Sequence, residues 1–275
     1  MENSAEVLQT AVDIAYEAGE IVRERFGQPQ DVAFKGEVNP VTETDRASET
    51  HIVQRLQAAF PDHHILAEEE GGDALRTPGA LWIIDPVDGT NNFAHGFPHI
   101  GISIALVVDS VPQIGVIYDP LRDECFAARY GAGATLNGDP IQVSAVERLA
   151  QSFLATGFPY DRRVAKDNNV LRLDHFLRRS QGVRRAGAAV LDLAYVACGR
   201  FDGFWEIALS PWDVAAGILI VHEAGGEVTD FEGAPFPLDG EEIVASNGVV
   251  HEAMLRVIHE GGDTPHPDFD PDRAL

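Results

Sequence analysis

The sequence predicts a protein that combines helices with β-sheet, α+β in its first half and α/β in its second. From residue 81 to about 137, short apolar runs are separated by turn residues, a pattern typical of strands joined by hairpins. After Ser144 the pattern changes to longer segments in which strands alternate with helices. We therefore place a boundary near residue 145, with one half at 1–145 and the other at 146–260.

Two helices precede the predicted sheet. Apolar residues recur at helical spacing from Val7 to Val22, which predicts an amphipathic helix that ends near Gly27. A second helix is predicted to begin after Thr42, with Asp45 as the acid of a capping box. Capping alone accounts for Asp45, so the residues by themselves leave a structural role and a catalytic role open.

The remaining elements follow from apolar runs and turn residues. In the first half, strands are predicted at 81–84, 100–108, 113–118 and 124–129, with turns at 109–110 and 119–123. We expect the two helices to pack on this largely antiparallel sheet. In the second half, we expect strands at 153–156 and 243–245, a hairpin or strand edge at 201–206, and helices at 168–179, 187–199, 213–224 and 251–259. Residues 261–275 are rich in proline and aspartate, which predicts a disordered acidic tail.

Composition restricts the possible partners. The 275 residues include 20 basic and 44 acidic ones, a formal net charge of −24, which repels nucleic acid and anionic membranes. No stretch approaches the ~20 apolar residues needed to cross a bilayer, and the first residues carry acids where a signal peptide needs bases. We therefore expect a cytoplasmic protein. Cys125 and Cys198 are isolated in the sequence, so we expect buried thiols and neither a disulfide nor a zinc site.

Carboxylates collect where the apolar run 82–84 ends, at Asp85 and Asp88. Two neighbouring aspartates repel each other unless one is protonated or a cation lies between them, and hard divalent cations such as Mg²⁺ suit such oxygens. Gly89 and Thr90 follow, at a helix start whose backbone N–H groups can hold an anion. An acid-rich turn is the simpler alternative. The segment predicts a metal beside a phosphate.

Two further acids occupy comparable places. Glu68 follows a short apolar strand at 65–67, and Asp213 stands in the first turn of an apolar helix, where a plain capping role is the simpler reading of that residue alone. His95 and His99 lie near the metal motif, but an oxygen-rich site for Mg²⁺ does not call for imidazole, so we expect neither as a ligand. No serine lies in a Gly-x-Ser-x-Gly elbow, which leaves water as the expected nucleophile.

Together these segments resemble the inositol monophosphatase family of Mg²⁺-dependent sugar phosphatases, from the first helix to about residue 260. The first family signature is similar to residues 85–93, and the second is similar to residues 212–217 together with 223–226. The resemblance implies the layered α/β/α/β/α sandwich of the sugar phosphatases, usually a homodimer. It also implies a lithium-sensitive enzyme that hydrolyses inositol monophosphate.

The resemblance also implies roles for individual residues. Two to three Mg²⁺ ions are expected per site, bound by Glu68, Asp85, the carbonyl of Val87, Asp88 and Asp213. Asp45 and Thr90 match the positions that orient the attacking water. Glu68 is expected to be catalytic as well. The phosphate is expected at Gly89 and Thr90. The phosphorylated polyol is expected to contact Asp88, Gly187, Ala188, Ala189 and Glu206.

Several alternatives stay open. Within the family, these are the phosphatases of histidinol phosphate, fructose 1,6-bisphosphate and 3′-phosphoadenosine nucleotides, although residues 91–98 resemble the inositol branch more than the nucleotide branch. Ala188 stands where animal members usually have a hydroxyl residue, so the preferred substrate stays open. An alternative of another class is a regulatory binding protein with a phosphatase fold. Converging carboxylates argue against it, because they repel one another when no metal is bound.

Overall fold

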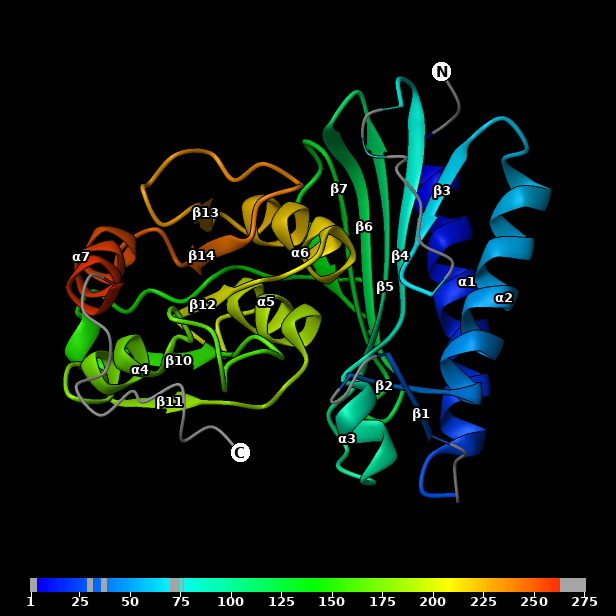
Figure 1. Ribbon diagram of the computed structural model, residues 1–275. Helices are drawn as coiled ribbons and strands as arrows, with labels where there is room; N and C mark the ends of the chain where they lie inside the picture. Colours follow the sequence, from blue (N-terminus) through cyan, green and yellow to red (C-terminus); the bar gives the residue numbers. More distant parts are fainter. Residues whose placement is uncertain (1–3, 29–31, 36–38, 70–74, 76, 263–275) are drawn as a thin grey trace.

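Helices and sheets are stacked in five layers in the computed structural model, which describes residues 4–28, 32–35, 39–69, 75 and 77–262 (Figure 1). One outer layer consists of α1 (Ser4–Arg25) and α2 (Glu43–Ala59), and the other of α4 (Val170–Leu177) and α7 (His251–Gly262). Between the two sheets lie α5 (Ala189–Ala197) and α6 (Pro211–Glu223). The predicted α/β/α/β/α sandwich is confirmed.

The first sheet is largely antiparallel, as predicted. Its described strands follow the order β3 (His64–Ala67), β4 (Ala80–Asp88), β5 (Gly101–Val108), β6 (Val111–Asp119), β7 (Glu124–Arg129), β8 (Ala134–Leu136) and β9 (Asp139–Pro140). Only the β3–β4 pair is parallel among them. A separate antiparallel ribbon, β1 (Val32–Lys35) with β2 (Asn39–Thr42), leads into α2. The predicted turns at 109–110 and 119–123 connect the hairpins.

The second sheet corrects one sequence prediction. Its described strands follow the order β11 (Gly182–Arg184), β10 (Phe153–Thr156), β12 (Gly203–Ile207), β14 (Glu242–Ser246) and β13 (Glu227–Thr229). The segment predicted as a hairpin or strand edge is therefore the central strand β12, paired with β10 on one side and β14 on the other. Phe204 and Trp205 are fully buried on its opposite faces, which explains the continuous apolar run.

Several helix boundaries differ from the prediction by one to three residues, among them those of α4 and α7. The helix predicted at 168–179 begins only at Val170, because Asn169 has a left-handed backbone with φ of 65° and its side chain bonds to Trp205 Nε1 and Thr156. The last helix extends to Gly262, three residues beyond the predicted end at 259. The acidic tail predicted at 261–275 lies outside the described residues from 263 onward.

Alternate side chains of β4 enter two different apolar cores. Leu81 and Ile83 face α5 and α6, whereas Trp82 and Ile84 face α1 and α2. A third core, on the far side of the second sheet, includes Trp205 and packs against α4 and α7. Helices α5 and α6 contact strands of both sheets, so the two predicted halves are packed closely together. The boundary at residue 145 stays a prediction.

Two glycines let the central helix α6 approach its neighbours closely. A Cβ on Gly115 of β6 would lie 2.7 Å from the carbonyl oxygen of Ala216, and one on Gly217 would lie 2.5 Å from Leu193 of α5. Neither position has room for a side chain in so closely packed an interior. Helix α6 therefore has a fixed place, and its first turn carries Asp213.

Two further predictions concern the burial of the cysteines and the lack of a membrane-spanning segment. Cys125 is buried as predicted, but Cys198 is only partly buried because it follows the last turn of α5; both are free thiols. None of the helices in the described part of the chain combines the length and apolar character needed to cross a bilayer.

Candidate metal centre and substrate pocket

An irregularity in β4 turns two aspartates toward the same side. Asp85 pairs with Ser103 of β5 and Asp88 pairs with Gly101, so three steps along β4 match two steps along β5. In a regular strand, residues three apart point to opposite faces, and an extra residue reverses that alternation. Pro86 suits the bulge because it has no N–H to pair. The bulge allows Asp85 and Asp88 to face one point.

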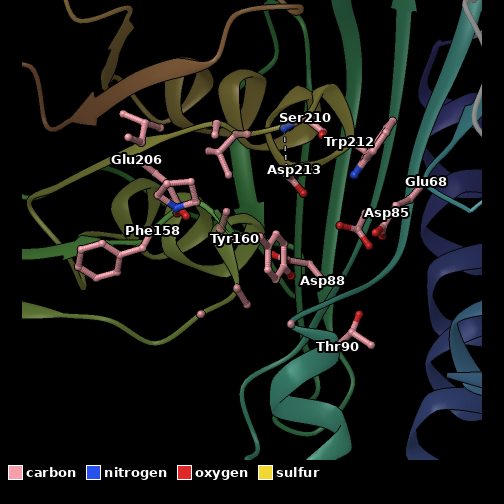
Figure 2. A pocket seen from close by; sticks show the side chains of 18 of the residues that line it. Glu68, Asp85, Asp88, Thr90, Phe158, Tyr160, Glu206, Ser210, Trp212 and Asp213 are labelled. Carbon is pink, nitrogen blue, oxygen red and sulfur yellow. Dashed lines mark hydrogen bonds between the residues drawn. The ribbon is translucent and has the colours of Figure 1, made fainter. Parts of the chain in front are cut away.

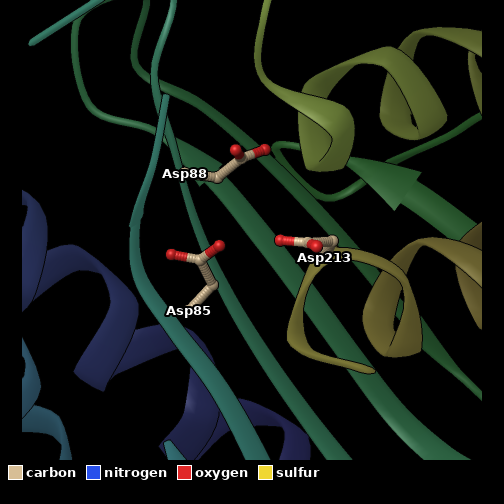
Figure 3. A group of neighbouring side chains, drawn as sticks. All are labelled: Asp85, Asp88 and Asp213. Atoms are coloured by element: carbon tan, nitrogen blue, oxygen red, sulfur yellow. The ribbon is translucent and has the colours of Figure 1, made fainter. Parts of the chain in front are cut away.

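Asp213 completes a group of three acids at this point. One carboxylate oxygen from each of Asp85, Asp88 and Asp213 lies within 4.8 Å of the others. Figure 3 shows the two strand aspartates directed toward the aspartate at the start of α6. Acids separated by 125 positions in the sequence therefore form one cluster. The sequence prediction that both halves contribute to one acidic centre agrees with this geometry.

The three carboxyl groups resist ionisation. Removal from water raises the pKa of Asp85 well above its ordinary value, and the charges of Glu68, Asp88 and Asp213 raise it further. Removal from water also raises the pKa of Asp88 to about 7, although an N–H bond from Val190 opposes the rise. Burial, and then the charge of Asp88, raises the pKa of Asp213 well above its usual range. A cation among these oxygens would relieve the repulsion, and an all-oxygen donor set fits a hard divalent ion.

Glu68 and Val87 lie beside the cluster. Glu68 follows β3, which runs parallel to β4, and its charge contributes to the raised pKa values of all three aspartates. The carbonyl oxygen of Val87, in the bulge, lies 3.1 Å from Thr90 Oγ1. Both residues line the same cavity as the acids. Their predicted roles as metal ligands are compatible with these positions and stay predictions.

Asp213 caps its helix as well as facing the acids. Its Oδ2 accepts a 2.7 Å hydrogen bond from the backbone N–H of Ser210, in a capping box at the start of α6. The sequence left capping and metal binding as competing roles for this residue. A carboxylate has two oxygens, so the cap uses one of them and the second remains for the cluster.

Asp45 has the same double arrangement. Its Oδ2 accepts a 2.9 Å hydrogen bond from the backbone N–H of Thr42 and one from the Thr42 hydroxyl, which caps α2. Its Oδ1 accepts a 2.9 Å bond from Thr90 Oγ1. Burial raises the pKa of Asp45, and these hydrogen bonds partly oppose the rise. The capping role and the contact with Thr90 therefore coexist.

The turn after the acids is built on Gly89. Its backbone is left-handed, with φ of 89°, and it precedes the short helix α3 (Thr90–Ala94). The Gly89 N–H lies against the Asp88 carboxylate and lowers the pKa of that group. Gly89 and Thr90 both border the cavity, which is where their predicted contact with phosphate would be made.

A cavity of about 190 Å³ joins the predicted residues (Figure 2). Of the residues predicted for the site, it is lined by Glu68, Asp85, Val87, Asp88, Gly89, Thr90, Gly187, Ala188, Ala189, Glu206 and Asp213. Asp45 does not line it and reaches it only through Thr90. His95 and His99 are also not among the residues that line it, and the expectation that neither is a ligand stays a prediction.

Glu206 lies on the side of the cavity formed by the second sheet. It belongs to the central strand β12 and is only 9% exposed. Burial raises the pKa of Glu206 to about 8, and the guanidinium of Arg185 opposes that rise. The arrangement is a buried carboxyl group beside a guanidinium cation.

The segment before α5 forms the wall between Glu206 and the acids. Gly187, Ala188 and Ala189 line the cavity there, and Val190 N–H donates a 2.8 Å hydrogen bond to Asp88 Oδ2. The residue that directly follows the predicted polyol-binding segment is thus hydrogen-bonded to a predicted metal ligand. The Val190 bond could not be predicted from the sequence, because its donor is a backbone group.

Sequence reasoning also missed an apolar wall. Phe158, Pro159, Tyr160, Leu209 and Trp212 line the cavity with the polar residues. In Figure 2 the side chains of Tyr160 and Trp212 lie around the acids. The only sequence signal was the position of Trp212 next to Asp213, because the segment at 158–160 is distant from every motif.

The chain is similar to several known proteins. The sequence profile of the inositol monophosphatase family matches residues 3–262. An inositol-1-monophosphatase of Synechocystis sp. is 44% identical over 256 residues, 91% of this chain and 89% of that protein. The Nus factor SuhB of Pseudomonas aeruginosa is 43% identical over 263 residues, 92% of this chain and 95% of that protein.

The solved structure of an inositol monophosphatase from Anabaena (Nostoc) sp. has the same fold. It matches with a TM-score of 0.87 at 41% identity, over 97% of this chain and all of that one. Because the family profile spans nearly the whole chain and the fold agrees, the chain belongs to the inositol monophosphatase family.

Proposed function

We propose that this chain is a Mg²⁺-dependent phosphomonoesterase that hydrolyses inositol monophosphate to inositol and phosphate. The observation that carries the proposal is the cavity with three convergent aspartates at one side and the buried Glu206 at the other. The first side suits a phosphate held by cations, and the second suits hydroxyl groups. The names of similar proteins, which include inositol-1-monophosphatase, support the same substrate.

Two to three Mg²⁺ ions per site are part of the proposal, and the donor set of the acids supports binding of a hard divalent cation. The candidate ligands are Glu68, Asp85, the Val87 carbonyl, Asp88 and Asp213, all of which offer oxygen, and burial makes their charges costly unless a cation is present. When bound, Mg²⁺ supplies positive charge toward the phosphate and makes hydroxide available near neutral pH. By the same family resemblance, Li⁺ is expected to inhibit.

Thr90 and Asp45 are proposed to orient and deprotonate the attacking water. The Thr90 hydroxyl donates to Asp45, so its oxygen lone pairs remain to accept a hydrogen bond from water. Asp45 is held by Thr42, and its raised pKa makes the carboxylate a stronger base than an exposed aspartate. The Gly89 and Thr90 segment would hold the phosphate for in-line displacement.

Glu206 is proposed to recognise the polyol. A carboxylate accepts strong hydrogen bonds from vicinal hydroxyls when it is ionised, and the Arg185 guanidinium opposes part of the rise in the pKa of Glu206 that burial causes. Asp88, between the polyol segment and the acids, would contact the ester end of the substrate, with Gly187, Ala188 and Ala189 forming the wall.

A regulatory role is the second candidate, because the similar SuhB protein carries the name of a Nus factor. The net charge of −24 disfavours nucleic acid as the partner. A cytoplasmic location and a homodimer are further parts of the proposal, supported by composition and by family resemblance respectively.

Phosphate release from a substrate panel tests the proposal. The panel comprises inositol 1-phosphate, histidinol phosphate, fructose 1,6-bisphosphate and 3′-phosphoadenosine 5′-phosphate, each with Mg²⁺ and with chelator. We expect the highest kcat/KM for inositol 1-phosphate, no turnover in chelator and inhibition by Li⁺. Absence of turnover on every substrate with Mg²⁺ present would favour the regulatory alternative.

A further inference from the structure

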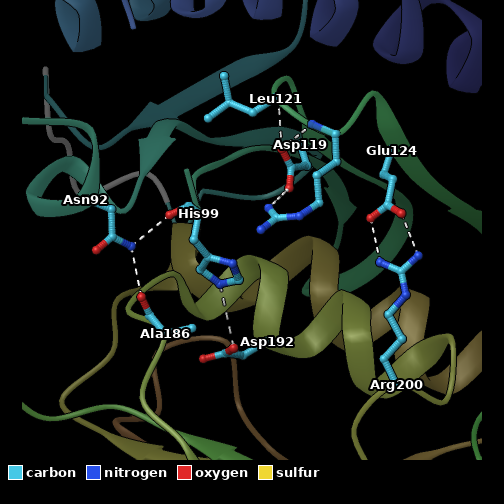
Figure 4. A network of polar contacts seen from close by, with 9 residues as sticks. Asn92, His99, Asp119, Leu121, Glu124, Ala186, Asp192 and Arg200 are labelled. Carbon is cyan, nitrogen blue, oxygen red and sulfur yellow. Dashed lines mark hydrogen bonds and ion pairs between the residues drawn. The ribbon is translucent and has the colours of Figure 1, made fainter. Parts of the chain in front are cut away.

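Asn92 joins the segment that carries the acids to the segment that lines the polyol side of the cavity. It lies on α3, four residues after Asp88. Its side-chain Nδ2 lies 2.7 Å from the carbonyl oxygen of His99 and 2.9 Å from that of Ala186 (Figure 4). The same nitrogen lies 3.2 Å from the carbonyl oxygen of Gly187. One amide group therefore contacts three carbonyls from two distant stretches of chain.

Three converging carbonyl dipoles repel one another unless a donor lies between them. The amide nitrogen of asparagine carries two N–H donors, which suits the place where only acceptors meet. The junction is also tightly packed, since a Cβ on Gly89 would lie 2.9 Å from the His99 carbonyl and 3.3 Å from both the Gly187 carbonyl and Asn92 Nδ2. A donor at position 92 therefore stabilises the close approach of these backbone segments.

We propose that Asn92 is a positioning residue that sets the place of the polyol-binding segment 186–189 relative to the acids at 85–90. The inference rests on the proposed function and identifies a residue that acts through the substrate wall without touching the reacting atoms. Asn92 does not itself line the cavity, whereas Gly187 does. Holding the alcohol and the phosphate in fixed relation is worth a large part of catalysis, and a displacement of 1 Å is costly.

Two other contacts cross the same junction, and each differs from Asn92. The Val190 N–H bond ends on Asp88, so it cannot be removed without altering the acids. The His99 ring faces Asp192 of α5, with 3.9 Å between Nε2 and Oδ1, but neither facing atom has a hydrogen-bond partner in the described part of the chain. Asn92 is the contact that a substitution can test most cleanly.

The experiment compares Asn92→Ala with the matched control Asn91→Ala, which changes an exposed asparagine of the same helix. KM and kcat are measured on inositol 1-phosphate and on p-nitrophenyl phosphate, which has no hydroxyl groups to be recognised. Asn92→Ala is expected to raise KM for inositol phosphate roughly tenfold while kcat for the aryl phosphate stays within about twofold, and the control should change neither. Asn92→Asp, which directs an acceptor at the three carbonyls, should be worse than alanine, and Asn92→Gln should recover part of the affinity.

Hydrogen exchange supplies a readout independent of turnover. Backbone amides in 186–190 are expected to exchange faster in Asn92→Ala than in the parent protein, with the core of the first sheet unchanged; Asn92→Ser replaces alanine if that variant does not fold. Equal losses on both substrates, or unchanged exchange at 186–190, would overturn the inference. A parent protein that does not hydrolyse inositol phosphate would contradict the proposed function, and the exchange experiment would then decide the positioning role alone.

Discussion

The Thr90 hydroxyl donates a hydrogen bond of 2.9 Å to Asp45, although the two residues are 45 positions apart. Asp45 stands in the capping box of α2, and Thr90 starts α3 beside the bulge in β4. This hydrogen bond links α2, in an outer layer, to Thr90, which lines the cavity. It also means that a residue outside the cavity lining can take part in proton transfer.

Thr90→Ala is expected to lower kcat by on the order of a hundredfold or more, as for loss of a positioned acid–base group. Thr90→Ser, which keeps the hydroxyl, should retain most of the activity. Steady-state kinetics with saturating Mg²⁺ measures both variants, and thermal unfolding checks that each is folded. If alanine and serine behave alike, the hydroxyl does not orient the nucleophile.

Asp213→Asn separates capping from metal binding, because the side-chain amide oxygen of asparagine can still accept the Ser210 N–H bond of the capping box. The Ser210 N–H bond can be kept, while a charge facing the other acids is lost. We expect turnover to fall by on the order of a hundredfold and the Mg²⁺ requirement to rise. Titration of activity against Mg²⁺ measures both effects. Near-parental turnover at limiting Mg²⁺ would remove Asp213 from the metal centre.

Glu206→Gln should weaken the use of inositol phosphate more than that of an aryl phosphate. The expected difference in transition-state stabilisation is on the order of 1–3 kcal/mol, the range for a charge-assisted hydrogen bond. The ratio of kcat/KM values for the two substrates measures it. An unchanged ratio would show that Glu206 supports the fold or the acids and does not recognise hydroxyls.

Stability of the metal-free protein is expected to fall as pH rises from 6.5 to 8.5. The pKa values of Asp88 and Glu206 are raised to about 7 and 8, so the folded protein retains protons that the unfolded chain has already released. The expected loss is on the order of 1–3 kcal/mol in the free energy of unfolding. His99, whose pKa is lowered to about 4 by burial, has the opposite effect only below this window.

Denaturant unfolding in chelator, at several pH values, measures that loss. Added Mg²⁺ is expected to restore much of the stability at pH 8.5, because a cation among the acids favours their ionised forms. Stability that rises with pH in chelator would contradict the burial of unpaired acids.

Contiguous motifs made much of the site predictable. Asp85, Asp88, Gly89 and Thr90 lie in one short segment at the end of an apolar strand. Their proximity could therefore be predicted from the sequence. The position of Asp45 could be predicted as a cap, since capping depends on residues three apart. Its contact with Thr90 could not, because it depends on how α2 packs against the first sheet.

Other features depend on pairing between distant strands. The bulge at Pro86 is defined by the register of β4 against Ser103 and Gly101, which no local pattern encodes. The central position of β12 likewise depends on its pairing with β10 and β14. The contacts of Asn92 with Ala186 and Gly187 cross 94 and 95 positions, and backbone carbonyls leave no mark on a sequence.

The close approach of Gly217 in α6 to Leu193 in α5 makes the position of Asp213 depend on packing between these two helices. Gly217 is one helical turn beyond Asp213, and a methyl group there would push α6 away from α5. Such a shift would carry the Asp213 carboxylate with it. A substitution in the middle of the apolar layer can therefore impair activity, although it lies far from any substrate. The effect of any substitution along α6 should be judged by how far it moves the first turn of that helix.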